Sequence, residues 1–263
     1  MDQLVWHNNL TFNPNKIITF VKHNLHGLLP LYQTEYQQLK SYSKSHNFPI
    51  KSLVSIRNLV KIQEEICRGR ISPKTKEDII ESFKHLLKDP SKQSIYQFFS
   101  SHKVSVKNII FTISTLPEYR NLSKDSLKHI FKYVKDMETA DSKSKINSQK
   151  FEDDLSNWLK KHTSTPFKTE LQIRSETATM RSTPDVLFDK PIEITVNGTT
   201  HKISWIDAKN YALVNVPFII RSLTKQSDKY QLEIGPGAFV FHYGIDPSIR
   251  IGNTLLLDGS MIS

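Results

Sequence analysis

An Asn-Gly pair between two alternating segments is the feature that most restricts how this chain can fold. Apolar and polar residues alternate over 192–196 before Asn197-Gly198, and over 203–209 after it. Both residues of the pair tolerate the positive φ angles of a type I′ turn, and period-two alternation is typical of strands. The apolar run 186–188 ahead of this segment is expected to end at Pro191. The sequence therefore predicts a β-hairpin.

Charged residues lie close to this hairpin. Asp207 and Lys209 are two apart on the second strand, so their side chains project from one face. Asp185 follows Pro184 and precedes the run 186–188, and a strand there would bring it near Asp207. Two carboxylates can hold a divalent cation, and an ammonium beside them can orient water. The pattern predicts a metal-dependent phosphodiesterase centre, although composition alone fits equally well a proline-led turn followed by a strand ending in solvated charge.

A second motif follows the hairpin. Gln226 and Tyr230 are four residues apart, so on a helix they share one face. Such a pair supplies neutral hydrogen bonds to phosphate oxygens and sugars, which position a nucleic-acid backbone without identifying its bases. Solvated helix surface is the simpler interpretation of the pair. Gly235-Pro236-Gly237 is interpreted only as a helix stop and turn.

These motifs together resemble a known family, the codanin-interacting nucleases, whose TPD domain belongs to the PD-(D/E)XK nuclease superfamily. The residues that carry the resemblance, with the spacings between them, are Thr183-Pro184-Asp185, Trp205-Ile206-Asp207-Ala208-Lys209, Gln226, Tyr230 and Gly235-Pro236-Gly237. The resemblance is strong from about Lys150 onward and is carried by helical pattern and order before that. It implies an α+β or α/β fold, with a helical, helix-turn-helix-like N-terminal domain ahead of a restriction-endonuclease-like core. In such a core, helices flank a mixed β-sheet.

The same resemblance implies a cofactor, a ligand set and a partner. Mg²⁺, or Mn²⁺ in its place, would be bound by Asp185, Asp207 and the backbone carbonyl of Ala208, while Lys209 would position or help deprotonate water. A codanin-like protein would be the partner. Animal members carry Glu at the position of Asp207, and the superfamily pattern allows either acid.

A further acid on the first helix of the core is also implied by the resemblance. Glu152 is the candidate, because it lies at the edge of an apolar stripe between Phe151 and Leu159. A solvated acid favoured by the helix dipole is an equally good interpretation. Glu170 is a rival for this position and Glu176 a weaker one.

The first half of the chain predicts successive helices. Ser72-Pro73 is typical of a helix start, and Ser105 is a plausible N-cap after a short turn. Two short helices joined there would fit a helix-turn-helix, with Lys107 and Asn108 reading a duplex. A bundle that merely packs is the competing interpretation.

A polar segment without periodicity, residues 137–149, predicts a linker between two domains. We therefore expect a helical domain over 1–145 and the nuclease-like domain over 146–263.

Composition restricts the setting and the partners. A net charge of +10 favours phosphate backbones as partners. Apolar runs stay short of the ~20 residues that cross a bilayer, so no membrane association is expected. The single Cys67 excludes a cysteine-based zinc site and is typical of a reducing compartment. The first residues do not resemble a signal peptide, so we expect an intracellular protein of the nucleus, the cytoplasm or both.

The sequence thus predicts a Mg²⁺-dependent nuclease acting on DNA or a structured nucleic acid. One alternative is a catalytically idle nuclease fold that serves as a scaffold for a codanin-like partner or for nucleic acid. Another is a helical nucleic-acid-binding protein with an accessory β domain. The intact set of Asp185, Asp207 and Lys209 favours the enzyme.

Overall fold

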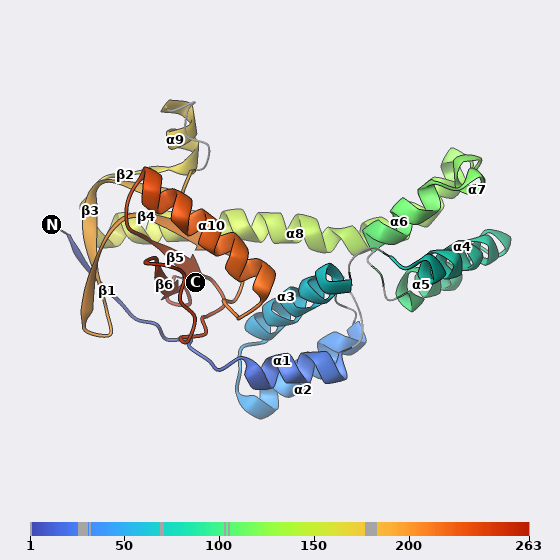
Figure 1. The fold of residues 1–263 in the computed structure, drawn as a ribbon, viewed down its shortest axis with the longest axis horizontal. Helices are drawn as coiled ribbons and strands as arrows, with labels where there is room; N and C mark the ends of the chain where they lie inside the picture. The colour runs from blue at the N-terminus through green and yellow to red at the C-terminus, as the bar shows by residue number, and fades with distance from the viewer. Residues whose placement is uncertain are drawn as a thin grey trace. The chain divides into compact units, whose positions relative to one another are not determined.

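The computed structural model describes residues 2–25, 31, 33–68, 71–102, 104, 106–176 and 183–262 (Figure 1). The chain divides into two compact units. The sheet unit comprises Met1–Ile18, Phe48–Ile56 and Lys145–Ser263, and the helical unit comprises Thr19–Asn47 and Arg57–Ser144. The longest segment of the sheet unit thus begins at the boundary expected near residue 145, while two earlier segments also belong to it.

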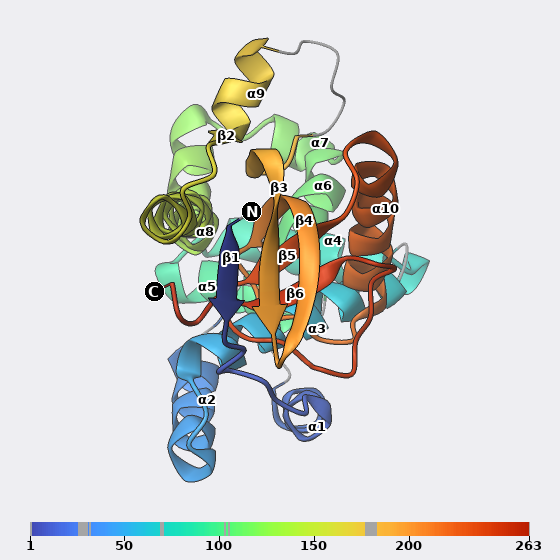
Figure 2. The same cartoon turned by 90° about the vertical axis from the view of Figure 1, so that its left-hand side faces the viewer.

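Within the described residues, six strands form one mixed sheet in the order β1-β3-β4-β5-β6, with β2 paired to β3 (Figure 2). The strands are β1 (Gln3–Trp6), β2 (Phe167–Thr169), β3 (Val186–Val196), β4 (Thr199–Lys209), β5 (Gly237–Phe241) and β6 (Leu255–Asp258). β2, β3 and β4 pair antiparallel, whereas β1, β5 and β6 join in parallel. The expected mixed sheet is confirmed.

The predicted hairpin is confirmed as β3 and β4. Asn197 and Gly198 turn the chain with φ angles of 49° and 78°. The expected break at Pro191 is wrong, since β3 continues through it. The register shifts between Leu187 and Ile192, and this irregularity accommodates a residue that has no N–H to donate to the ladder.

An N-terminal strand lies where the sequence analysis expects a helical domain. β1 pairs in parallel with the far end of β3, Leu4 opposite Ile194 and Trp6 opposite Val196. Leu4 and Trp6 are buried, and the Trp6 indole N–H donates to the Asp258 carbonyl over 2.8 Å. The first residues of the chain therefore complete the sheet.

Two helices cover the sheet. α8 (Lys124–His162) buries Phe151, Leu155 and Leu159 against one face of the strands. α10 (Pro217–Glu233) lies on the other face (Figure 2). There Tyr230 meets Trp205 with ring centroids 4.7 Å apart. The short α9 (Glu170–Glu176) connects β2 to the segment before β3.

Residues 137–149, expected to mark the boundary or linker between two domains, are helical and form part of α8, and the division between the two units falls within them, between Ser144 and Lys145. The segment contains no Gly or Pro, and its Met, Glu, Ala, Lys and Gln residues are good helix formers. A helix without an apolar stripe has no hydrophobic periodicity that would reveal it.

The helical unit contains α8 as far as Ser144 and draws on the remaining helices. These are α1 (Asn15–Asn24), α2 (Gln33–His46), α3 (Ile50–Arg68), α4 (Pro73–Lys88), α5 (Lys92–Ser101), α6 (Val106–Ser114) and α7 (Pro117–Arg120). Two of them, α1 and α3, begin in the sheet unit. The predicted start of α4 is confirmed, since the Ser72 hydroxyl accepts from the Thr75 N–H over 3.1 Å. Two short helices, α5 and α6, form as expected, but the predicted Ser105 cap and the Lys107 side chain lie outside the described residues. A duplex-reading role for Asn108 on α6 stays a prediction.

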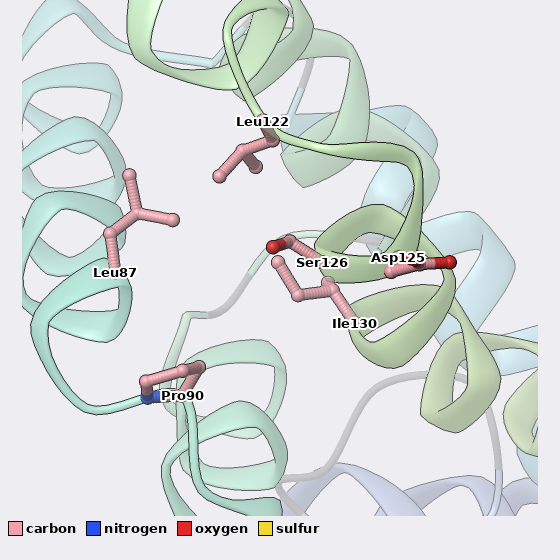
Figure 3. A pocket seen from close by; sticks show the side chains of 6 residues that line it. All are labelled: Leu87, Pro90, Leu122, Asp125, Ser126 and Ile130. Atoms are coloured by element: carbon pink, nitrogen blue, oxygen red, sulfur yellow. The ribbon is translucent and has the colours of Figure 1, made fainter.

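One hollow of about 290 Å³ lies among the helices of this unit (Figure 3). Its walls are mostly apolar and consist of Leu87, Pro90, Leu122, Asp125, Ser126 and Ile130. The hollow therefore lacks the cationic lining that a nucleic acid would need.

Among the helices that the structure describes, none is long and apolar enough to cross a membrane.

Candidate active site

The predicted acid and lysine of β4 meet at the end of that strand. Asp207 is only 4% exposed, and the Lys209 ammonium lies 2.6 Å from its Oδ1. The same ammonium donates to Gln226 Oε1 over 2.9 Å and sits 5.1 Å from the centre of the Phe239 ring. Lys209 is thus held at one position by three neighbours. Such a fixed ammonium can orient a water or a phosphate oxygen.

Asp185 joins these residues from the segment before β3. Its Oδ2 accepts a hydrogen bond of 2.6 Å from the backbone N–H of Ala208. Burial, and then the charge of Asp207, raise the pKa of Asp185 to about 8, against the opposing effects of that hydrogen bond and of Lys209. Among the residues that the structure describes, none donates a hydrogen bond to its Oδ1. Asp185 therefore holds a proton at neutral pH and keeps one oxygen open for a ligand.

Gln226 and Tyr230 lie side by side on α10, as the four-residue spacing predicts, but their polar groups turn inward. The Gln226 amide N–H donates to Asp207 Oδ2 over 2.7 Å and to the Tyr230 hydroxyl over 2.9 Å. That hydroxyl lies 3.0 Å from Asp207 Oδ2 and 2.8 Å from the Thr183 carbonyl. Tyr230 is 1% exposed, so it orders Asp207 instead of reaching the backbone of a nucleic acid, the role expected for it. Gln226 likewise uses both amide atoms on protein groups.

The Gly-Pro-Gly segment does more than end a helix. Gly235 adopts a φ of +112°, and its carbonyl accepts from the Trp205 indole N–H over 2.9 Å. A Cβ on Gly237 would stand 2.1 Å from Cε2 of the same indole. Trp205 is fully buried and packs on Tyr230. The segment thus fixes the position of the aromatic side chains that pack beneath the acids. The interpretation of the segment as only a helix stop and turn missed this role.

The three candidates for a further acid are placed differently. Burial, and then the charges of Glu170 and Asp207, raise the pKa of Glu152, so both acids lie near it. Glu170 accepts from the Thr183 hydroxyl over 3.1 Å. Glu176 instead pairs with Lys168. Glu152 and Glu170 therefore neighbour the site, whereas Glu176 is engaged elsewhere.

The donor set fits a magnesium ion better than a metal that needs many protein ligands. Over the described ranges, no group of three or more His, Cys, Asp or Glu side chains is arranged to hold a metal. Asp185 and Asp207 supply two carboxylates, and Mg²⁺ commonly takes one or two carboxylates and completes its shell with water and substrate phosphates. The raised pKa of Asp185 indicates a site short of positive charge. A divalent cation would supply the positive charge that the two acids lack.

Two residues near the acids were missed by the sequence analysis. Arg174 on α9 donates to Glu170 over 2.5 Å and to the Thr183 hydroxyl over 3.3 Å. The four-residue spacing from Glu170 could have revealed it. Burial and the charge of Asp207 also raise the pKa of Tyr211, two residues beyond Lys209. Nothing in the sequence around Tyr211 distinguishes it from a packing residue.

Comparison with known proteins places these motifs in a family. The chain is 40% identical to an uncharacterized protein of Acanthamoeba polyphaga mimivirus, over all of this chain and 97% of the viral protein. No solved structure matches the chain significantly. The family described as "protein of unknown function TPD sequence-motif" matches residues 119–258, which include both acids, Lys209, Gln226 and Tyr230. The chain belongs to this TPD sequence-motif family.

Proposed function

We propose that this protein is a Mg²⁺-dependent nuclease that hydrolyses phosphodiester bonds in DNA or a structured nucleic acid, on a restriction-endonuclease-like core. One observation carries the proposal: the buried Asp207 is paired with the Lys209 ammonium, and the partly buried Asp185 lies close enough for the charges of both to shift its pKa. Such a cluster is costly to maintain unless a cation joins it. Its hard oxygen ligands favour Mg²⁺, or Mn²⁺ in its place.

Each residue of the cluster has a role in the proposed reaction. Asp185 and Asp207 would hold the ion, aided by the Ala208 carbonyl. When bound, Mg²⁺ supplies Lewis-acid polarisation of the phosphate and stabilises charge on its oxygens. Lys209, as an ammonium, orients the attacking water, and its charge favours loss of the water proton to solvent. The water oxygen forms a bond to phosphorus while the bond from phosphorus to the leaving sugar oxygen breaks, and that oxygen takes up a proton.

The surrounding residues hold the reacting groups in place. Gln226 accepts from Lys209 and donates to Asp207, so one amide fixes the acid and the ammonium relative to each other. Tyr230 adds a second bond to Asp207 from a buried position. Positioning of this kind contributes to rate because the groups need not reorganise during reaction.

The charge of the chain supports a polynucleotide substrate. A net charge of +10 attracts a phosphate backbone, and the attraction weakens with salt. A small phosphodiester would make little use of such an extended charge. DNA is the substrate class that we propose first.

Two isosteric substitutions test the proposal. Asp185→Asn and Asp207→Asn keep the size of the side chains and remove the ligand charge, and we expect each to lower cleavage at least about 100-fold. Asp189→Asn, at an exposed position on β3, is the matched control and should cleave like the wild type. Labelled duplex, flap, hairpin and single-stranded substrates would be incubated with Mg²⁺, Mn²⁺ or EDTA.

Calorimetric titration with Mg²⁺ separates the enzyme from an idle scaffold. Binding that disappears in Asp207→Asn, together with cleavage that needs the metal, would support the nuclease. Wild-type-like cleavage by both isosteric variants would refute the site assignment. Absence of both Mg²⁺ binding and cleavage on every substrate would favour the idle fold.

A further inference from the structure

The guanidinium of Arg174 stands beside the acid cluster with most of its surface open to solvent. Its Nη2 donates to Glu170 Oε1 over 2.5 Å, and its Nε donates to the Thr183 hydroxyl over 3.3 Å. Thr183 in turn donates to the same Glu170 oxygen over 3.1 Å. These three side chains therefore form a closed set of hydrogen bonds that fixes the direction of the guanidinium.

This set is tied to the proposed centre by the backbone. The Glu170 N–H donates to the Asp185 carbonyl over 3.1 Å. Thr183 lies two residues before Asp185, and its carbonyl accepts from Tyr230, the residue that also contacts Asp207. Arg174 is thus bonded to a residue whose backbone lies at most about 7 Å from that of Asp185.

A surface ion pair is the simplest explanation of the Glu170 contact, since the two residues are four apart on α9. A surface ion pair does not account for three features of Arg174 taken together. The Arg174 side chain is 65% exposed, and within the described part of the chain it uses two of its five N–H donors. It is also bonded to Thr183, nine residues further along the chain, and an ordinary helix pair does not need such a contact.

The negative charges of the site explain why a guanidinium would be needed there. Glu152, Glu170 and Asp207 would repel a phosphate, and the Lys209 side chain is only 14% exposed beside Asp207, whereas Arg174 reaches the solvent. A polyanionic strand needs a further cation to settle there. The planar fork of an arginine matches phosphate oxygens with two parallel hydrogen bonds, which a lysine cannot do.

We propose that Arg174 binds a backbone phosphate of the nucleic-acid strand, next to the phosphate that is cleaved. This inference rests on the proposed nuclease function and names a substrate contact for the same site. Glu170 and Thr183 act as positioning residues that aim the guanidinium. The remaining donors of Arg174 reach the phosphate.

The test measures the salt dependence of nucleic-acid affinity and the rate of cleavage. Arg174→Ala and Arg221→Ala each remove one exposed positive charge. Arg221 is the control, because it lies on α10 five residues before Gln226, and the side chains of Arg221 and Gln226 therefore point about 140° apart on that helix. Binding of a labelled DNA would be followed from 50 to 200 mM salt with Ca²⁺ in place of Mg²⁺. We expect Arg174→Ala alone to reduce the slope of log affinity against log salt by about 0.7 to 0.9, the loss of one phosphate contact.

Cleavage gives the second readout. We expect Arg174→Ala to lower kcat/KM roughly 10- to 150-fold, which is the loss of one charge-assisted hydrogen bond. Arg174→Lys keeps the charge and loses the fork, so it should retain the salt slope and still cleave more slowly than the wild type. If the alanine variant folds poorly, Arg174→Lys still tests whether the guanidinium fork contributes to cleavage.

The outcomes separate the two proposals. An Arg174→Ala variant with the wild-type salt slope and a kcat/KM within twofold of wild type overturns the phosphate contact while leaving the nuclease intact. Equal losses in Arg174→Ala and Arg221→Ala overturn it as well, since a general charge effect would then explain both. A wild-type protein that neither binds nor cleaves nucleic acid overturns the nuclease itself.

Discussion

Replacing Asp185 by Asn should change how the stability of the metal-free protein depends on pH. The folded protein keeps a proton on Asp185 up to about pH 8, because the carboxyl is buried beside Asp207. In the unfolded chain the same group releases its proton near 3.8. Unfolding between these two values therefore releases a proton, so the free energy of unfolding falls as pH rises through this window.

The size of the effect follows from the proton count. One proton released on unfolding lowers the free energy of unfolding by about 1.4 kcal/mol per pH unit. Between pH 5 and pH 7 the wild type should thus lose about 3 kcal/mol more than Asp185→Asn, whose amide does not titrate. The amide oxygen of Asn can still accept from Ala208, so the fold is retained.

Tryptophan fluorescence is the assay suited to this comparison. Trp6, Trp158 and Trp205 are the only tryptophans of the sequence and all belong to the sheet unit, so fluorescence reports the unfolding of the unit that holds the site. Urea titrations in EDTA at several pH values would give the free energies. Asp189→Asn, an exposed acid on the same strand, should keep the pH dependence of the wild type. Parallel curves for wild type and Asp185→Asn would refute the reasoning.

Two further predictions concern the support beneath the site. Gly237→Ala would place a Cβ 2.1 Å from the Trp205 indole, so we expect this overpacking to lower the free energy of unfolding by roughly 1–3 kcal/mol, seen as a lower urea midpoint; an unchanged midpoint would contradict the close contact. Tyr230→Phe removes a hydroxyl from Asp207 and from the Thr183 carbonyl, so we expect a loss of about 1–3 kcal/mol and slower cleavage. Wild-type stability and rate in this variant would show that the hydroxyl has no part in ordering Asp207.

Local signals in the sequence predicted the centre of the sheet well. The hairpin at Asn197-Gly198 needs only a turn with positive φ and two alternating strands, and it forms as expected. The meeting of Asp185 with Asp207 and Lys209 follows from strand parity and from the pairing of neighbouring segments. These features depend on residues close together in the chain.

Features that depend on distant contacts were not predictable in the same way. β1 is four residues long, and its partner lies about 190 residues away, so its short alternation alone does not distinguish it from a loop. The inward orientation of Tyr230 depends on Thr183 and Asp207, which no spacing rule relates to it. The role of Gly237 depends on the exact position of the Trp205 ring.

The pairing of the two ends of the chain has a consequence for synthesis in the cell. Trp6 and Leu10 hydrogen-bond to Asp258, about 250 residues later. As the chain leaves the ribosome, these first residues must wait until the last strand has emerged, whereas the helical unit already has its own segments available. Such long-range closure is slow compared with local helix formation. Until β6 has been made, Trp6, which is buried in the folded protein, therefore stays uncovered.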